Sequence, residues 1–134
     1  MEKIIEFLEK NKSGVLATSQ NNRPHARPQH VHFIKDGKFY FTTANVKKAY
    51  EQLKENPYIE FVVTTEDFTI VRISGEIKFT NSLDEKQMVI DNAPLVKKGY
   101  QTADNPLLEV FYLEHGEASL TKLFTKEPTE TFTF

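Results

Sequence analysis

The strongest constraint on the fold is a series of short β-forming segments separated by tight turns. The dipeptide Asp36-Gly37 favours a two-residue hairpin turn, and it separates the segments 25–35 and 38–43. Further segments rich in Val, Ile, Phe and Thr lie at 14–19, 58–65, 68–79, 107–114 and 117–124. In hairpin order these strands predict a mainly β fold with peripheral helices, built as an antiparallel barrel that is closed or nearly closed.

Turn residues set the expected limits of several strands. Residues 21–24, Asn-Asn-Arg-Pro, predict a turn, and residues 25–35 are expected as one long strand. Residues 107–114 and 117–124 are expected to form the last hairpin around His115-Gly116. The alternating residues 131–134 are expected to add an edge strand or to dock on a partner.

Helical signals occur near the amino terminus and between the strands. Apolar residues in the first dozen positions recur at helical spacing and predict an amphipathic helix. Asn45 is predicted to cap a helix that runs to about residue 55. Ser82 begins a capping-box pattern that opens a helix to about residue 92, and residues 94–100 are expected to continue as a second short helix.

Length and composition limit the kinds of partner that the chain can bind. The 134 residues have the usual size of one domain, so we expect a single domain over residues 1–134. A net charge of −2 and a pI near 6.1 argue against nucleic acid and anionic membrane, which both reward a basic excess. Without cysteine there is no disulfide or thiol nucleophile. No apolar stretch approaches the roughly 20 residues that cross a bilayer, so we expect a cytoplasmic protein.

The most informative segment is Phe41-Thr42-Thr43-Ala44-Asn45-Val46-Lys47-Lys48, which places two hydroxyl groups on a strand and two lysines at a helix start. A helix start carries a partial positive charge, so two cations there are disfavoured unless an anion binds. Free backbone N–H groups, threonine hydroxyls and ammonium groups together suit a phosphate monoester. The pattern predicts a phosphate site, with two solvated lysines as the alternative.

Two residues of the preceding segment support the same site. Arg27 lies in the segment 25–35, which the Asp36-Gly37 turn is expected to join directly to the strand with the two threonines, so Arg27 can face the same anion. Pro28 cannot donate to a neighbouring strand, which indicates either an ordinary edge strand or a place where a flat ligand lies against the backbone.

Several short segments carry a family resemblance through their order and spacing. They are Gly14-Val15-Leu16-Ala17-Thr18, Arg27-Pro28-Gln29, residues 38–48, Ala49-Tyr50-Glu51-Gln52-Leu53 with Asn56-Pro57, Arg72-Ile73-Ser74-Gly75, and Glu109-Val110-Phe111-Tyr112-Leu113. Over nearly its whole length the chain resembles the flavin-binding split barrel family, which includes pyridoxamine 5'-phosphate oxidase and small nitroimidazole-resistance-like flavoproteins. The resemblance implies an antiparallel split β-barrel of the FMN-binding type.

The resemblance also implies a cofactor and a partner. The cofactor is flavin mononucleotide (FMN), and the partner is a second copy of the chain, with the flavin at the interface of the homodimer. By position, the paired threonines and lysines hold the phosphate, while residues 27–29 line the ribityl chain and the isoalloxazine ring. The predicted cofactor-binding residues are Arg27, Pro28, Gln29, Thr42, Thr43, Asn45, Lys47 and Lys48.

Departures from the vitamin-converting oxidases favour the small, reductase-like branch. The chain ends before the carboxy-terminal Arg-x-His signature of those oxidases. His32 stands where they have a substrate-binding lysine, and Ile70 stands where they have a flavin-contacting glutamine. We expect an FMN-dependent oxidoreductase, without pyridoxamine phosphate oxidase activity, that passes electrons from NADH or NADPH to a small acceptor. The flavin supplies the chemistry, so no catalytic residue is named. The alternative is a flavin-binding carrier or redox sensor without turnover.

Other polar residues support weaker interpretations. His25, His30 and His32 lie within eight residues, and the last two share one strand face, so a metal or haem site is a rival interpretation. The sequence offers no clear further ligands, so we favour histidines beside a flavin pocket and predict no metal. Three strand glutamates are interpreted as structural or surface residues: Glu76, Glu109 and Glu114.

Overall fold

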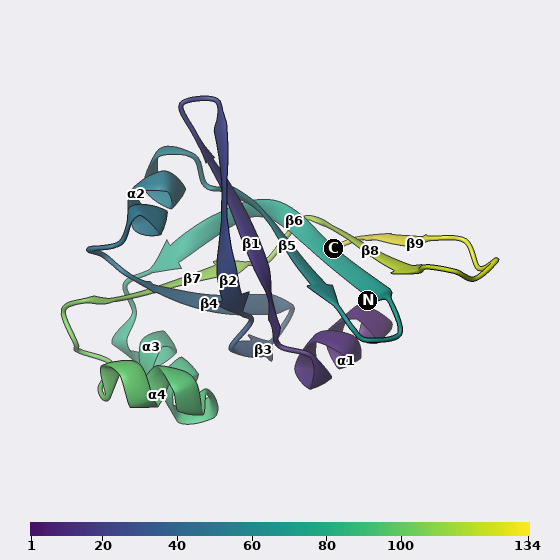
Figure 1. The fold of residues 1–134 in the computed structure, drawn as a ribbon. Coiled ribbons are helices and arrows are strands. Elements are labelled where there is room, and N and C mark those ends of the chain that lie inside the picture. The colour runs from purple at the N-terminus through teal and green to yellow at the C-terminus, as the bar shows by residue number, and fades with distance from the viewer.

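The β-forming segments fold into a split antiparallel barrel in the computed structural model, which describes residues 1–134 (Figure 1). The elements in chain order are α1 (Glu2–Lys10), β1 (Ser13–Gln20), β2 (Arg23–His30), β3 (Phe33–Lys35), β4 (Lys38–Ala44), α2 (Lys48–Glu55), β5 (Tyr58–Thr64), β6 (Thr69–Thr80), α3 (Leu83–Asn92), α4 (Pro94–Tyr100), β7 (Leu108–Leu113), β8 (Glu117–Lys122) and β9 (Glu130–Thr133).

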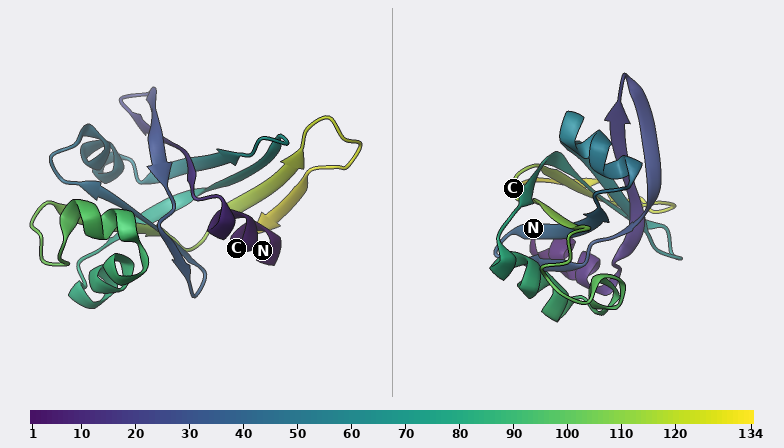
Figure 2. Two further views of the ribbon diagram at one scale, coloured as in Figure 1. Left: turned by 60° about the horizontal axis from the view of Figure 1, so that its bottom comes forward. Right: turned by 90° about the vertical axis from the view of Figure 1, so that its left-hand side faces the viewer.

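The strands form one sheet in which every pairing is antiparallel. Along the sheet the order is β2-β1-β5-β6-β7-β4-β3, and β8 and β9 branch from β6. The long strand β6 pairs with β8 through its first half and with β7 through its last residues. Figures 1 and 2 show the β8–β9 pair extending from the barrel as an arm.

Both two-residue turns at the start of the sheet have the left-handed backbone that such hairpins need. Asp36 and Gly37 have φ angles of 52° and 76° and join β3 to β4 as predicted. Asn21 and Asn22 have φ angles of 52° and 61° and join β1 to β2. The predicted four-residue turn is therefore too long, because β2 already begins at Arg23.

The single strand predicted over 25–35 is wrong, because the chain bends between β2 and β3. β2 pairs with β1, whereas β3 pairs with β4. The bend lies at Val31, whose side chain is fully buried in the core and whose backbone N–H donates to the Lys12 carbonyl at 2.9 Å. The expectation that Arg27 lies on a strand hairpinned directly to the two threonines is wrong for the same reason.

The predicted hairpin between 107–114 and 117–124 is also wrong. β7 and β8 do not pair with each other, because both lie along β6, one after the other. The chain crosses between them at Gly116, where an added Cβ would lie 1.9 Å from the Ser74 carbonyl oxygen. The missing side chain therefore permits a close backbone approach. The predicted edge strand near the carboxyl end is confirmed, since β9 pairs with β8.

Two apolar cores hold the helices against the sheet. The larger core fills the barrel and includes Phe41, Phe61 and Phe111, with Ile4 and Leu8 of the predicted helix α1. The smaller core packs the predicted helices α3 and α4 against β4 and β7. Figures 1 and 2 show α2 on one side of β4 and the α3–α4 pair on the other. None of the helices is long and apolar enough to span a membrane.

The helix starts differ in how they are capped. Ser82 caps α3 as predicted, because its hydroxyl accepts the backbone N–H three residues later at 3.2 Å. The prediction that Asn45 caps α2 is wrong, because Lys47 occupies the cap position and no side chain bonds there. The Asn45 side chain instead donates to the Pro106 carbonyl at 2.7 Å and to the Glu109 carboxylate at 3.0 Å. This contact ties the end of β4 to the start of β7.

Candidate functional site

A cavity of about 280 Å³ opens between β2, β4, the start of α2 and the helix α4. Its lining is Ser13, Pro28, Gln29, His30, His32, Thr42, Lys47, Leu95, Val96 and Tyr100. No acidic residue lines this cavity, and its one permanent cation is Lys47. The lining therefore favours ligands that carry negative charge or oxygen acceptors.

The cavity brings together four of the eight predicted cofactor residues: Pro28, Gln29, Thr42 and Lys47. Gln29 makes the connection, because its side-chain amide donates to the Thr42 carbonyl at 3.2 Å. β2 and β4 do not pair in the sheet, so this side-chain contact bridges the two strands across the split in the barrel.

The other four predicted residues lie outside the cavity lining. Thr43 follows Thr42 on β4, so its side chain points to the opposite face of the strand. Asn45 makes its contacts with the β7 end of the chain, as described above. Lys48 is the exposed first residue of α2, directly after Lys47. Arg27 points toward β1 and α2.

The Arg27 guanidinium is held by acceptors of its own chain. It donates to the Thr18 hydroxyl at 2.9 Å, to the Leu16 carbonyl at 3.2 Å and to the Gln52 side-chain oxygen at 2.5 Å. Thr18 donates to the same Gln52 oxygen at 2.7 Å, and both of these side chains are buried. No carboxylate belongs to this network, and partial burial lowers the pKa of Arg27. The network fixes β2 against α2.

The start of α2 has the properties of an anion site. No side chain caps it, and the backbone N–H groups of Lys48 and Ala49 have no acceptor in the chain. Lys47 and Lys48 are exposed and form no ion pair. The one acid of the first turn, Glu51, is exposed to solvent. Free N–H groups beside two free ammonium groups suit a phosphate group.

The cavity also contains residues that were not assigned to a cofactor site from the sequence. His30 and His32 stack with their ring centroids 5.7 Å apart. Burial, followed by the charges of His30 and Lys12, lowers the pKa of His32 to about 4, so its imidazole is neutral at pH 7. The spacing of the two histidines was the signal for this part of the lining. The α4 residues give no such signal, because apolar residues on a short helix predict core packing equally well.

Other polar groups noted in the sequence have contacts elsewhere. The structure assembles no group of three or more His, Cys, Asp or Glu residues that could hold a metal ion. Glu109 accepts the Asn45 amide, and Glu114 lies 4.0 Å from Lys38 and 3.5 Å from His115. These contacts are typical of structural and surface residues, as predicted for both glutamates.

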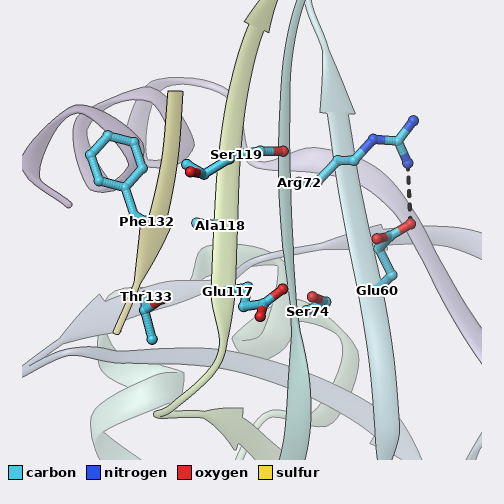
Figure 3. A pocket seen from close by; sticks show the side chains of 9 residues that line it. Glu60, Arg72, Ser74, Glu117, Ala118, Ser119, Phe132 and Thr133 are labelled. Carbon is cyan, nitrogen blue, oxygen red and sulfur yellow. Dashed lines mark hydrogen bonds and ion pairs between the residues drawn. The ribbon is translucent and has the colours of Figure 1, made fainter. Parts of the chain in front are cut away.

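A second cavity, of about 400 Å³, lies on the outer face of β5, β6, β8 and β9 (Figure 3). Figure 3 shows Arg72 paired with Glu60 at one side, at 3.1 Å, and Phe132 and Thr133 of β9 at the other. Both members of the ion pair are half exposed, so water competes with it. None of the predicted cofactor residues lines this cavity.

The fold and the sequence pattern occur together in a known family. The sequence profile described as "Pyridoxamine 5'-phosphate oxidase" matches residues 1–121. The chain therefore belongs to the pyridoxamine 5'-phosphate oxidase family, which confirms the resemblance drawn from the sequence. General stress protein 26 of Bacillus subtilis (strain 168) is a relative that is 26% identical over 132 residues, or 95% of this chain and 91% of that protein.

Solved structures share the whole fold. A nimc/nima family protein from Clostridium acetobutylicum is 28% identical, with a TM-score of 0.90 over 100% of this chain and 92% of that chain. A protein from Nostoc punctiforme PCC 73102, described as pyridoxamine 5'-phosphate oxidase-related and FMN binding, has a TM-score of 0.69 over 99% of this chain and 95% of that chain. The Nostoc protein is 15% identical, and at that level the likeness shows a common fold.

Proposed function

We propose that the chain binds FMN in the cavity between β2, β4, α2 and α4, and that it passes electrons from NADH or NADPH to a small acceptor. The start of α2 carries this proposal, because its free N–H groups and its two unpaired lysines suit a phosphate. Membership of the family and the FMN binding described for the Nostoc protein support flavin as the ligand. When bound, the flavin supplies the electron-transfer chemistry.

Different residues of the chain bind the phosphate and the isoalloxazine ring of FMN. Lys47, Lys48 and the free N–H groups of α2 hold the phosphate. Pro28 has no N–H group and leaves a flat part of β2 against which the ring lies, beside the amide of Gln29. Arg27 acts indirectly, because its hydrogen bonds orient β2 against α2. The protein therefore binds and orients the cofactor without needing a nucleophile.

Lys48→Ala tests the phosphate contact. We expect about tenfold weaker FMN binding, since charge-assisted hydrogen bonds are worth about 1.5 kcal/mol or more. Riboflavin lacks the phosphate, so its affinity should not change. Lys54→Ala is the matched control, because Lys54 lies in the last turn of the same helix. Fluorescence titration measures both ligands, and equal affinity of the wild-type protein for FMN and riboflavin would contradict a phosphate site.

Reduction of the bound flavin tests the electron transfer. The protein loaded with FMN is desalted and mixed anaerobically with excess NADH or NADPH, while the visible flavin band is followed. Bleaching of that band supports an oxidoreductase. A flavin that stays oxidised with both nucleotides favours the carrier or redox sensor instead.

We further propose that a second copy of the chain covers the cavity to form a homodimer. Two apolar side chains beside the start of α2 are exposed: Val46 by 76%, and Leu107 by 43%, whose backbone carbonyl accepts the N–H of Asn45. Exposed apolar groups gathered at one place mark interaction surfaces. Val46→Glu should therefore weaken self-association in sedimentation velocity, whereas Leu123→Glu, at an exposed leucine just beyond β8, should not. A wild-type protein that stays monomeric at every concentration, with and without FMN, contradicts this part of the proposal.

A further inference from the structure

Tyr100 lines the cavity next to a strained residue at the end of α4. Gln101 has φ 72° and ψ −52°, and the backbone N–H of Thr102 donates to the Tyr100 carbonyl at 2.9 Å. Together these features define a γ-turn of the rare kind with positive φ. Gln101 has a side chain, so this backbone is unfavourable and persists because its surroundings impose it.

Asn105 imposes this backbone together with the smaller core. Its side-chain amide donates to the same Tyr100 carbonyl at 3.0 Å, and its side-chain oxygen accepts the Leu107 backbone N–H at 2.9 Å. The Tyr100 ring packs against the smaller core between α3, α4 and the sheet. Two donors on its carbonyl and packing of its ring therefore fix both the backbone and the direction of the Tyr100 side chain.

The Tyr100 hydroxyl, by contrast, has no hydrogen-bond partner in the chain. Every fully buried polar side-chain atom of the protein has such a partner, so this hydroxyl is accessible. Burial of the ring raises the pKa of Tyr100, which keeps the hydroxyl protonated as a donor at neutral pH. The cavity supplies no carboxylate to accept its proton. An oxygen acceptor on a ligand is the complement of this group.

We propose that Tyr100 is a specificity-determining residue of the site, and that the strained turn at Gln101 holds its hydroxyl ready to donate to a carbonyl oxygen on a flat aromatic acceptor such as a quinone. This inference rests on the proposed function, because that acceptor lies beside a bound flavin. The residues assigned to the flavin come from β2, β4 and α2. The apolar residues Leu95 and Val96 of α4 are not assigned to the flavin, so they can contact the aromatic ring of the acceptor.

Removal of the hydroxyl tests the contact. The probe is 2-methyl-1,4-naphthoquinone, titrated into the oxidised, FMN-loaded protein while the flavin spectrum is followed. Tyr100→Phe should raise the dissociation constant of the quinone about 3- to 10-fold, as expected for one lost hydrogen bond. The dissociation constant of FMN should change less than about twofold. Tyr58→Phe, at an exposed tyrosine of β5, is the matched control and should leave both constants unchanged.

Relief of the strain tests the role of the turn. Glycine accepts positive φ without penalty, so Gln101→Gly should raise the melting temperature by about 2–4 °C. Gln101→Gly keeps the turn and should leave quinone affinity unchanged, whereas Asn105→Ala removes one of the two donors on the Tyr100 carbonyl and should lower quinone affinity. Unchanged quinone affinity in Asn105→Ala would overturn this part of the inference.

The remaining outcomes separate this inference from the proposed function. If the wild-type protein retains no FMN, the proposed function fails, and calorimetric titration of the flavin-free protein still decides whether Tyr100→Phe weakens quinone binding. Absence of quinone binding in both forms overturns the acceptor class. If Tyr100→Phe weakens FMN binding as much as it weakens quinone binding, Tyr100 does not act on the acceptor alone, and its assignment to the acceptor is overturned.

Discussion

The half-buried imidazole of His32 makes the stability of the flavin-free protein depend on pH. Its pKa is about 4 in the folded state, against 6.5 for an unperturbed histidine. Between these values the unfolded chain binds a proton that the folded chain excludes. Stability is therefore complete above about pH 6.5 and is lost as the pH falls toward 4. At about 1.4 kcal/mol per pKa unit, the whole shift corresponds to about 3 kcal/mol.

His32→Phe removes this dependence while it keeps a flat ring that can stack on His30. Urea unfolding at pH 7.5 and pH 4.5 gives the free energy of unfolding of both proteins. The wild-type protein should lose about 2 kcal/mol more than the variant over this interval. Titration of the carboxylates contributes to both proteins and cancels in the comparison. His32→Asn serves as a second variant in case the larger phenylalanine packs poorly.

The reasoning is refuted if the wild-type protein and both variants lose the same free energy between the two pH values. Equal losses would mean that the folded state admits the proton at position 32 as readily as the unfolded chain does. The stacked, cation-flanked environment described for His32 would then not hold in solution.

Two further predictions concern packing near β6 and α2. Gly116→Ala should destabilise the protein by about 2 kcal/mol or more, because the new Cβ meets backbone. Gly99→Ala, in α4 with open space around it, should stabilise by about 0.5–1 kcal/mol, and thermal unfolding compares the two. Gln52→Leu should destabilise by about 1–3 kcal/mol, because Thr18 and Arg27 lose their shared acceptor. Gln52→Glu keeps an acceptor for both and should unfold at nearly the wild-type urea midpoint.

The sequence predicted the features that depend on local chemistry. The turn at Asp36-Gly37 and the cap at Ser82 follow from residues that are neighbours in the chain, and both are confirmed. The barrel class follows from the number and the alternation of short strands. These features depend on residues that are adjacent in the chain, so they can be predicted without knowing which distant residues pack against them.

Features that depend on distant partners could not be predicted in the same way. The expected last hairpin failed because β7 and β8 each pair with a different part of β6, and this path brings Gly116 against Ser74, which is far away in sequence. Asn45 is not the cap because α2 begins after Lys47, and the bonds that the Asn45 amide nitrogen donates to Pro106 and Glu109 hold its side chain against β7. In both cases a long-range contact outweighs a correct local preference.

The candidate site brings some of the predicted residues together for a reason that differs from the predicted one. Arg27 was placed beside Thr42 through a continuous strand 25–35 that the structure divides, and Pro28 was placed there by the family resemblance. Arg27 lies outside the cavity, whereas Pro28 and Thr42 line it together because β2 and β4 face each other across the split. Proline explains the split: Pro24 and Pro28 occur on β2, an edge strand, and cannot donate from its free side. β2 therefore cannot complete a ladder with β4, and Gln29 spans the gap with its side chain. Pro28 therefore lines the cavity at the place where the two strands stay unpaired.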